Sequence, residues 1–150
     1  MKQANLFKAI LIFLLGFLSI GALFGGIVFI FKPDGSMYGI PTDILKGSPF
    51  KDFLIPGIIL LVTFGLIPVY IIYALIRKPE NRFLQKLNLL YDHHFAWTFT
   101  IYIGLGLIIW INIQTLIINA VDLLHTIYSS LGILIVCIAL LPKTRIGFKK

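Results

Sequence analysis

Four long apolar stretches constrain this chain more than any other feature of its sequence. They cover residues 9–31, 53–76, 95–118 and 120–141, and only the fourth contains a charged residue, Asp122. Each is long enough to cross a hydrocarbon core about 30 Å thick, which takes roughly 20 residues of α-helix. Lipid offers the backbone no hydrogen-bond partners, and the alternating pattern of a barrel is missing. We therefore expect an all-α membrane protein, an up-down bundle of four transmembrane helices.

The positive charges predict how these helices are oriented. Of the 13 Lys and Arg residues, all but Lys32, Lys46 and Lys51 lie before the first stretch, between the second and third, or after the fourth. The positive-inside rule then places both termini in the cytoplasm and residues 32–52 outside. The first stretch is expected to stay as a span, because it is longer than the apolar region of a signal peptide. With this distribution, the net charge of +7 does not indicate nucleic acid as a partner.

Composition and cysteine usage narrow the function classes further. The chain has 150 residues, 59% of them hydrophobic and 13% charged, so one membrane domain spanning residues 1–150 accounts for it. Its single cysteine, Cys137, cannot form an internal disulfide, which excludes thiol exchange by a cysteine pair. We expect no cofactor and no metal, since His93 and His94 are adjacent and point about 100° apart on a helix.

Both longer loops are expected to be ordered. Residues 32–52 are rich in Pro and Gly and include apolar side chains such as Met37 and Tyr38, which predicts an outer cap with a helical turn opening at Thr42 or Asp43. This cap is either a plain connector or a substrate lid. In residues 77–94, Pro79 is well placed to begin a short interfacial helix on the cytoplasmic side.

Glycine and proline indicate how the spans pack. The pair Gly21 and Gly25 in the first span, and Gly104 and Gly106 in the third, predict that spans one and three meet through glycine faces. Pro68, in the middle of the second span, is expected to kink the helix there.

One group of polar residues forms a candidate pocket. Asp122 and His125 are three residues apart and could hydrogen-bond, binding a polar head group or relaying a proton. Polar groups at membrane depth are costly unless paired or hydrated. The more ordinary interpretation is structural: Asn112 and Gln114 bond neighbouring helices, while Asp122 and His125 lie in water on the turn between spans three and four. The expected pocket residues are Asn112, Gln114, Asn119, Asp122, His125 and Tyr128, together with Asp34 and Asp52 from the outer loop.

Two segments resemble a known family. The outer loop and the residues after it follow the pattern P-x-G-S…S-P-F-x-D-F-L-I-P-G, and the third span contains W-I-x-x-Q from Trp110 to Gln114. They look like an uncharacterised family of small bacterial integral membrane proteins with four predicted helices. The resemblance implies a bacterial plasma (inner) membrane location and the four-span topology, and it supplies no mechanism.

Two classes of function fit these observations. The first is a small non-enzymatic integral membrane protein that binds membrane lipids, a partner membrane protein or a second copy of itself. It is favoured because no nucleophile, base and oxyanion donors stand together. The second is a minimal transporter or membrane enzyme acting on a lipophilic substrate from the outer leaflet. Convergence of Asp34 and Asp52 with Asp122 and His125 would favour the second class.

Overall fold

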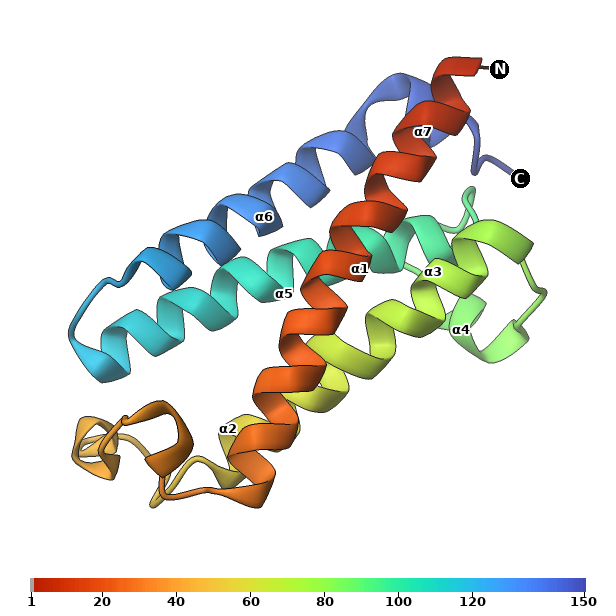
Figure 1. The fold of residues 1–150 in the computed structure, drawn as a ribbon. Coiled ribbons are helices and arrows are strands. Elements are labelled where there is room, and N and C mark those ends of the chain that lie inside the picture. Colours follow the sequence, from red (N-terminus) through yellow and green to blue (C-terminus); the bar gives the residue numbers. More distant parts are fainter. Residues whose placement is uncertain (1) are drawn as a thin grey trace.

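Four helices dominate the computed structural model, which describes residues 2–150. Each is long and apolar enough to cross a membrane, and they cover Ala4–Phe31, Leu54–Arg77, Phe95–Ile118 and Leu123–Leu140. The predicted all-helical class with four helices able to span a membrane is confirmed. The start of the first helix and the C-terminus lie at one end of the molecule, and residues 32–53 lie at the other (Figure 1). We call these the termini end and the loop end.

The helical elements follow one another with short connections. The second membrane-length helix is made of three consecutive elements, α2, η3 and α3, and the other long helices are continuous. In chain order the elements are α1 (Lys2–Phe31), η1 (Ser36–Tyr38), η2 (Thr42–Leu45), α2 (Leu54–Ile59), η3 (Leu60–Leu66), α3 (Ile67–Arg77), α4 (Arg82–Lys86), α5 (Phe95–Ile118), α6 (Leu123–Leu140) and α7 (Pro142–Ile146).

The turn between α5 and α6 is set by two polar residues. Asn119 ends α5 in a left-handed conformation with φ 51°, which asparagine tolerates better than most residues. Asp122 is extended and caps the start of α6. The fourth span therefore begins at Leu123, later than the predicted residue 120, because the capping residue stands outside the helix.

The second span widens before its proline. Pro68 has no N–H, and its ring would crowd the carbonyl four residues earlier, so a regular α-helix cannot continue through it undisturbed. Residues 60–66 form a π-helical segment, in which Ile67 donates its N–H to the carbonyl of Val62. The buried Ser19 hydroxyl of α1 donates to the carbonyl of Gly65 at 2.7 Å. The helix just before Pro68, where a kink was expected, thus contains a π segment tied to α1.

The long helices pair in chain order into two hairpins. The first hairpin is α1 with α2, η3 and α3, and the second is α5 with α6. Glycines bring both pairs close: a Cβ on Gly26 would lie 2.8 Å from the backbone nitrogen of Leu61, and one on Gly132 would lie 2.9 Å from the carbonyl oxygen of Gly104. Backbones therefore approach within each hairpin, where a side chain would separate them.

This pairing corrects the predicted meeting of spans one and three through glycine. Gly21 faces the hydroxyl of Tyr128 on α6, and Gly25 faces Leu60 of η3. The nearest atom to a Cβ on Gly106 would belong to Phe64 of η3, at 3.9 Å. The glycines of α1 thus serve contacts with the second and fourth spans. The faces they occupy could not be assigned without knowing which helices are neighbours.

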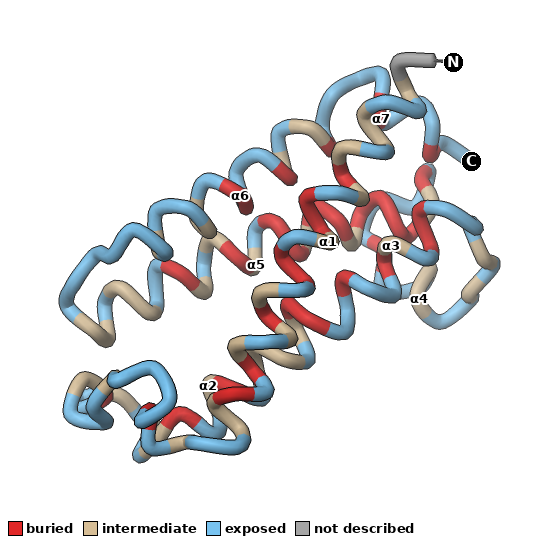
Figure 2. Tube along the Cα trace, in the orientation of Figure 1, coloured by how far each residue is buried: buried red, intermediate tan, exposed pale blue. Residues whose placement is uncertain are grey.

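The two hairpins pack together in the half of the molecule nearer the termini. The fully buried side chains there come from all four long helices, and Figure 2 shows the buried positions concentrated in this half. The indole of Trp97 on α5 donates to the carbonyl of Ala139 on α6 at 2.8 Å. Members of this core include Leu11, Leu15, Ile71, Leu75, Phe95, Trp97, Ile135 and Ala139.

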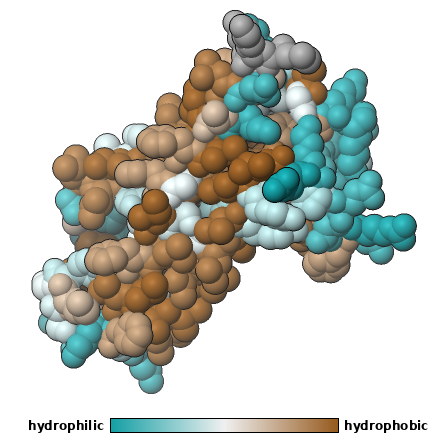
Figure 3. All heavy atoms as spheres, turned by 45° about the vertical axis from the view of Figure 1, so that its right-hand side comes forward, coloured by the Kyte–Doolittle hydropathy of each residue, from teal (hydrophilic) through white to brown (hydrophobic). Residues whose placement is uncertain are grey.

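The surface agrees with a membrane-spanning arrangement. On the face shown in Figure 3, hydrophobic side chains cover the middle of the molecule and hydrophilic ones gather toward its two ends. Exposed residues on α1 include Phe13, Ile20 and Phe24, at 70%, 72% and 66% exposure, on a helix that is apolar all round. Such exposure would be costly in water and is ordinary against lipid tails.

The connecting segments have their own local order. In residues 32–53, Gly35 has φ 76°, and a side chain there would collide with the carbonyl of Ile40. Thr42 begins the short helix η2, as expected. At the termini end, α4 begins at Arg82, with Asn81 accepting from the N–H of Leu84 at 3.0 Å. The prediction that Pro79 starts this helix is wrong, because an Asn side chain two residues later caps it.

Candidate functional site

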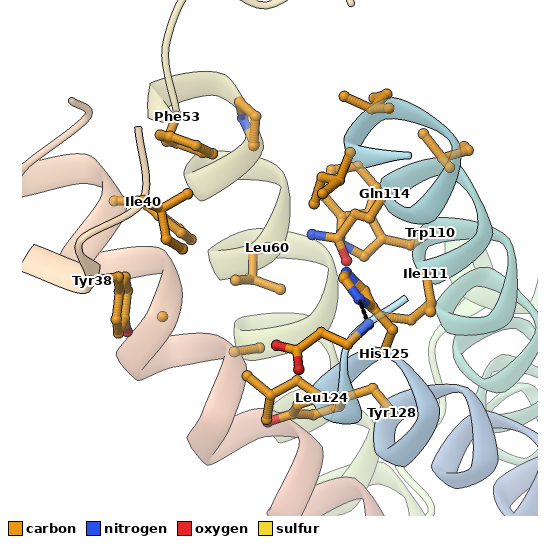
Figure 4. A pocket seen from close by; sticks show the side chains of 18 of the residues that line it. Tyr38, Ile40, Phe53, Leu60, Trp110, Ile111, Gln114, Leu124, His125 and Tyr128 are labelled. Atoms are coloured by element: carbon orange, nitrogen blue, oxygen red, sulfur yellow. Dashed lines mark hydrogen bonds between the residues drawn. The ribbon is translucent and has the colours of Figure 1, made fainter. Parts of the chain in front are cut away.

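A cavity of about 600 Å³ lies between the two hairpins at the loop end. One wall comes from α1, α2 and η3, the other from α5 and the first turns of α6, and residues of the loop complete it (Figure 4). It extends from the α5–α6 turn at Ala120 to Leu18 and Leu107, which stand in the interior of their helices. The cavity therefore occupies the loop-end half of the region that would lie in a membrane.

Most of the cavity wall is apolar. Figure 4 shows Ile40, Phe53 and Leu60 on the side of the first hairpin and Ile111 and Leu124 on the side of the second. Phe53 is buried and stacks on Phe29 of α1 with ring centroids 4.9 Å apart, which fixes the end of the loop against the helix. Walls of this kind hold water poorly and accept an apolar molecule.

Asp122 and His125 build the start of α6 at the edge of the cavity. Asp122 accepts the N–H of Leu123 at 2.6 Å, and its own N–H donates to Nδ1 of His125 at 3.0 Å. This reciprocal capping orients the imidazole. In the neutral ring the proton then lies on Nε2, which makes that atom a donor. Each side chain thus bonds to a backbone N–H at the start of α6. The expected hydrogen bond between the Asp122 carboxylate and the His125 imidazole is not formed.

Gln114 adds an amide to the same side of the cavity. It lies on α5, four residues after Trp110, and both side chains line the cavity. The Nε1 atom of Trp110 is covered and has no hydrogen-bond partner, while its ring packs near Phe64 with centroids 6.3 Å apart. An unpaired buried N–H is costly, so this donor is an unsatisfied group in the cavity wall.

Two tyrosines face the glycines of α1 across the cavity. The hydroxyl of Tyr128 on α6 approaches Gly21, and the hydroxyl of Tyr38 stands 4.0 Å from where a Cβ on Gly25 would be. Burial raises the pKa of Tyr38 above its ordinary value, and Tyr128 adds to the effect. These hydroxyls stay protonated at neutral pH and can donate or accept a hydrogen bond.

Four of the eight predicted pocket residues line this cavity or its edge, namely Gln114, Asp122, His125 and Tyr128. Asn112 and Asn119 do not. The side chain of Asn112 is exposed and donates back to the carbonyl of Ile108 at 2.7 Å. Asn119 ends α5 in the turn to α6 and is not among the residues that line the cavity.

The two outer-loop aspartates also lie elsewhere. Asp34 accepts the N–H of Ser36 at 3.0 Å, and the hydrogen bonds from Ser36 hold the pKa of that carboxyl below its usual range. Asp52 accepts the N–H of Leu54 at 2.9 Å. Both carboxylates cap local turns, which short Asp side chains commonly do. They do not converge with Asp122 and His125 on the cavity.

The remaining histidines are at the termini end. His94 caps α5 by accepting the N–H of Ala96 at 3.2 Å, and His93 is buried. Across residues 2–150, no group of three or more His, Cys, Asp or Glu side chains is placed to hold a metal ion.

Sequence reasoning missed the residues that make the cavity apolar. Tyr38, Phe53, Leu60 and Leu124 were not singled out as site residues, because apolar side chains are common throughout such a chain. One signal was present: a loop with several large apolar residues must cover something. Which helices it covers depends on the tertiary arrangement.

Comparison of the chain with protein-family models, curated proteins and solved structures finds no match. The site is therefore interpreted from its own geometry. It combines a largely apolar chamber between membrane-length helices with a small number of hydrogen-bonding groups, most of them toward the loop end. That combination suits an amphipathic or lipophilic molecule.

Proposed function

We propose that this chain is a small non-enzymatic membrane protein that binds a lipid in the cavity between its two hairpins. Its four spans form an up-down bundle in a bacterial plasma membrane, with both termini cytoplasmic. Residues 32–52 form the outer cap and α4 lies at the cytoplasmic interface. The resemblance to the family of small four-helix membrane proteins belongs to the same proposal.

The cavity is the observation that carries this proposal. Its volume of about 600 Å³ lies within the range of roughly 300–1,000 Å³ typical of small-molecule sites. Gln114, Asp122 and His125 stand toward the loop end, where Asp122 caps α6. The deeper wall at Leu18 and Leu107 is mostly apolar, with the Tyr128 hydroxyl beside Gly21 as a polar group there. A lipid inserted from the outer leaflet has the same polarity: its head lies at the interface and its tail toward the bilayer centre.

The alternative function, a minimal transporter or enzyme, has less support. Catalysis would need acid and base groups that meet around one point. Asp34 and Asp52 cap separate turns, and Asp122 is engaged with the backbone of α6. This dispersal favours binding over chemistry on a lipophilic substrate.

Filling the cavity tests the proposal. Leu124 lines the cavity and is 60% exposed, whereas its neighbour Leu123 is 70% exposed and is not among the lining residues. Full-length Leu124→Trp should therefore retain several-fold less lipid after purification in mild detergent, measured by mass spectrometry of the extracted lipids. Leu123→Trp is the matched control and should retain as much as the parent.

Both variants should keep the parent's thermal stability, since neither position is buried. Equal lipid retention by the parent, Leu124→Trp and Leu123→Trp would contradict the proposed cavity site. Loss of lipid in both variants would show binding on the outer surface of α6 instead, which also contradicts it.

A further inference from the structure

The C-terminal segment, residues 147–150, is tied to the start of α5. The N–H of His94 donates to the carbonyl of Phe148 at 2.9 Å, and the N–H of Lys150 donates to the carbonyl of Asp92 at the same distance. Phe148 is 3% exposed, and the ammonium of Lys78 lies 5.1 Å from its ring centroid. The segment is therefore a fixed part of the termini end, and Lys149 is held in a defined place beside His93.

Arg145 is oriented by a buried histidine. His93 is 4% exposed and packs against Trp97 in a tilted arrangement, with ring centroids 4.6 Å apart. Nε of Arg145 donates to Nε2 of His93 at 3.2 Å. Burial, and then the charge of Arg145, lower the pKa of His93, so the ring stays neutral and can accept this bond. The bond uses only Nε, which leaves the two terminal nitrogens of the guanidinium for another acceptor.

A pocket of about 360 Å³ lies beside this arginine. Its charged lining consists of Arg145, Lys149 and Asp92, and its apolar lining consists of Leu140, Pro142 and Ile146. Leu140 is the last residue of the fourth membrane-length helix, so the pocket stands at the boundary of the membrane region. Leu140 and Ile146 are 52% and 71% exposed, which leaves an apolar surface directly next to two cations.

We infer that this pocket binds the phosphodiester headgroup of an anionic phospholipid in the leaflet at the termini end. A guanidinium held through Nε can present its terminal nitrogens to two phosphate oxygens, and Lys149 adds a second positive charge. The carboxylate of Asp92 is an acceptor for a hydroxyl of the headgroup. Leu140, Pro142 and Ile146 meet the glycerol and the first methylene groups. Free phosphate would contact only the two cations, whereas a phospholipid would also cover the apolar surface beside them.

Titration of the full-length protein with defined lipids tests the inference. Native mass spectrometry in mild detergent should show tighter binding of phosphatidylglycerol than of phosphatidylcholine. Arg145→Gln and Lys149→Gln should each weaken phosphatidylglycerol binding about tenfold, because each removes a charge-assisted contact. Lys86→Gln, which removes an exposed charge on α4 at the same end, is the matched control and should leave binding unchanged.

Three outcomes would overturn the inference. Equal weakening by Lys86→Gln would show that net charge alone attracts the lipid. Competition by inorganic phosphate at millimolar concentration would show a free-anion site. Unchanged binding in Lys149→Gln, a substitution on an exposed side chain, would remove this pocket from consideration even if Arg145→Gln fails to fold. The site lies at the end opposite the proposed lipid cavity, so either can fail without the other.

Discussion

Single glycines decide how closely the helices approach within each hairpin. Gly104 and Gly132 face one another, so the backbone of α5 lies directly on that of α6. Gly16 lies on α1 with no atom within 4 Å of where its Cβ would be. The same residue type thus has a packing role at one position and none at another. Only the neighbours of each glycine distinguish the two cases.

Gly132→Leu should therefore destabilise the protein, whereas Gly16→Leu should not. A Cβ at position 132 would lie 2.9 Å from the carbonyl oxygen of Gly104 and from Ile108, so the two helices must separate. Overpacking of this kind costs about 1–3 kcal/mol. Thermal unfolding in one detergent measures the effect, with Gly16→Leu as the control. A melting temperature for Gly132→Leu equal to that of the control would contradict the close α5–α6 contact.

At the scale of the elements, the ends of helices are decided by a few polar side chains. Asp122 and His125 cap α6 reciprocally, Asn81 caps α4 and His94 caps α5. In a membrane protein, a free N–H at a helix end is satisfied only by such a side chain or by interfacial water. The polar residues near the membrane boundary therefore have a structural role before any role in binding.

Replacing the capping carboxylate tests this structural role. Asp122→Ala removes the acceptor for the N–H of Leu123 and should lower the free energy of unfolding by about 1 kcal/mol. Asp122→Asn keeps a side-chain oxygen and should change it by only a few tenths of a kcal/mol. Thermal unfolding of both variants in the same detergent measures the difference. If Asp122→Ala is as stable as Asp122→Asn, the cap does not stabilise α6.

At the scale of the whole molecule, the two hairpins share one core and one cavity. The core lies in the half nearer the termini, where α1, α3, α5 and α6 contribute buried side chains. The cavity lies in the other half, where the lining residues of the two hairpins face each other. Along the direction of its long helices, the molecule thus has a packed core in the half nearer the termini and the cavity in the other half.

The orientation of these halves in the membrane is testable by labelling. In a Cys137→Ser background, a membrane-impermeant thiol reagent should label Ser36→Cys in intact cells. It should label Lys86→Cys only after permeabilisation, because the excess of Lys and Arg at the termini end favours the cytoplasm. Both probes are at exposed positions. Labelling of Lys86→Cys in intact cells, with Ser36→Cys protected, would reverse the proposed topology.

The sequence by itself indicated four membrane-length helices, whereas the starts of the first and the fourth differ from the predicted residues 9 and 120. Long uncharged apolar runs such as residues 95–118 must be helical in lipid, because each backbone group has to find a partner within its own segment. This requirement is local and needs no knowledge of neighbours. Gln114, His125 and Tyr128 were also placed in one group, since they follow one another closely around the end of the third span and the start of the fourth.

Only the tertiary structure decided which side chains meet. Asn112 turns away from the cavity while Gln114 lines it, because the rotation of α5 is set by its contacts with Gly132 and the rest of α6. The apolar cavity wall brings Phe53 and Leu60 to the same space as Leu124, although these residues are far apart in the chain. Such contacts depend on which helix faces lie against one another. A helix that is apolar on every side does not specify which of its faces packs against a neighbour.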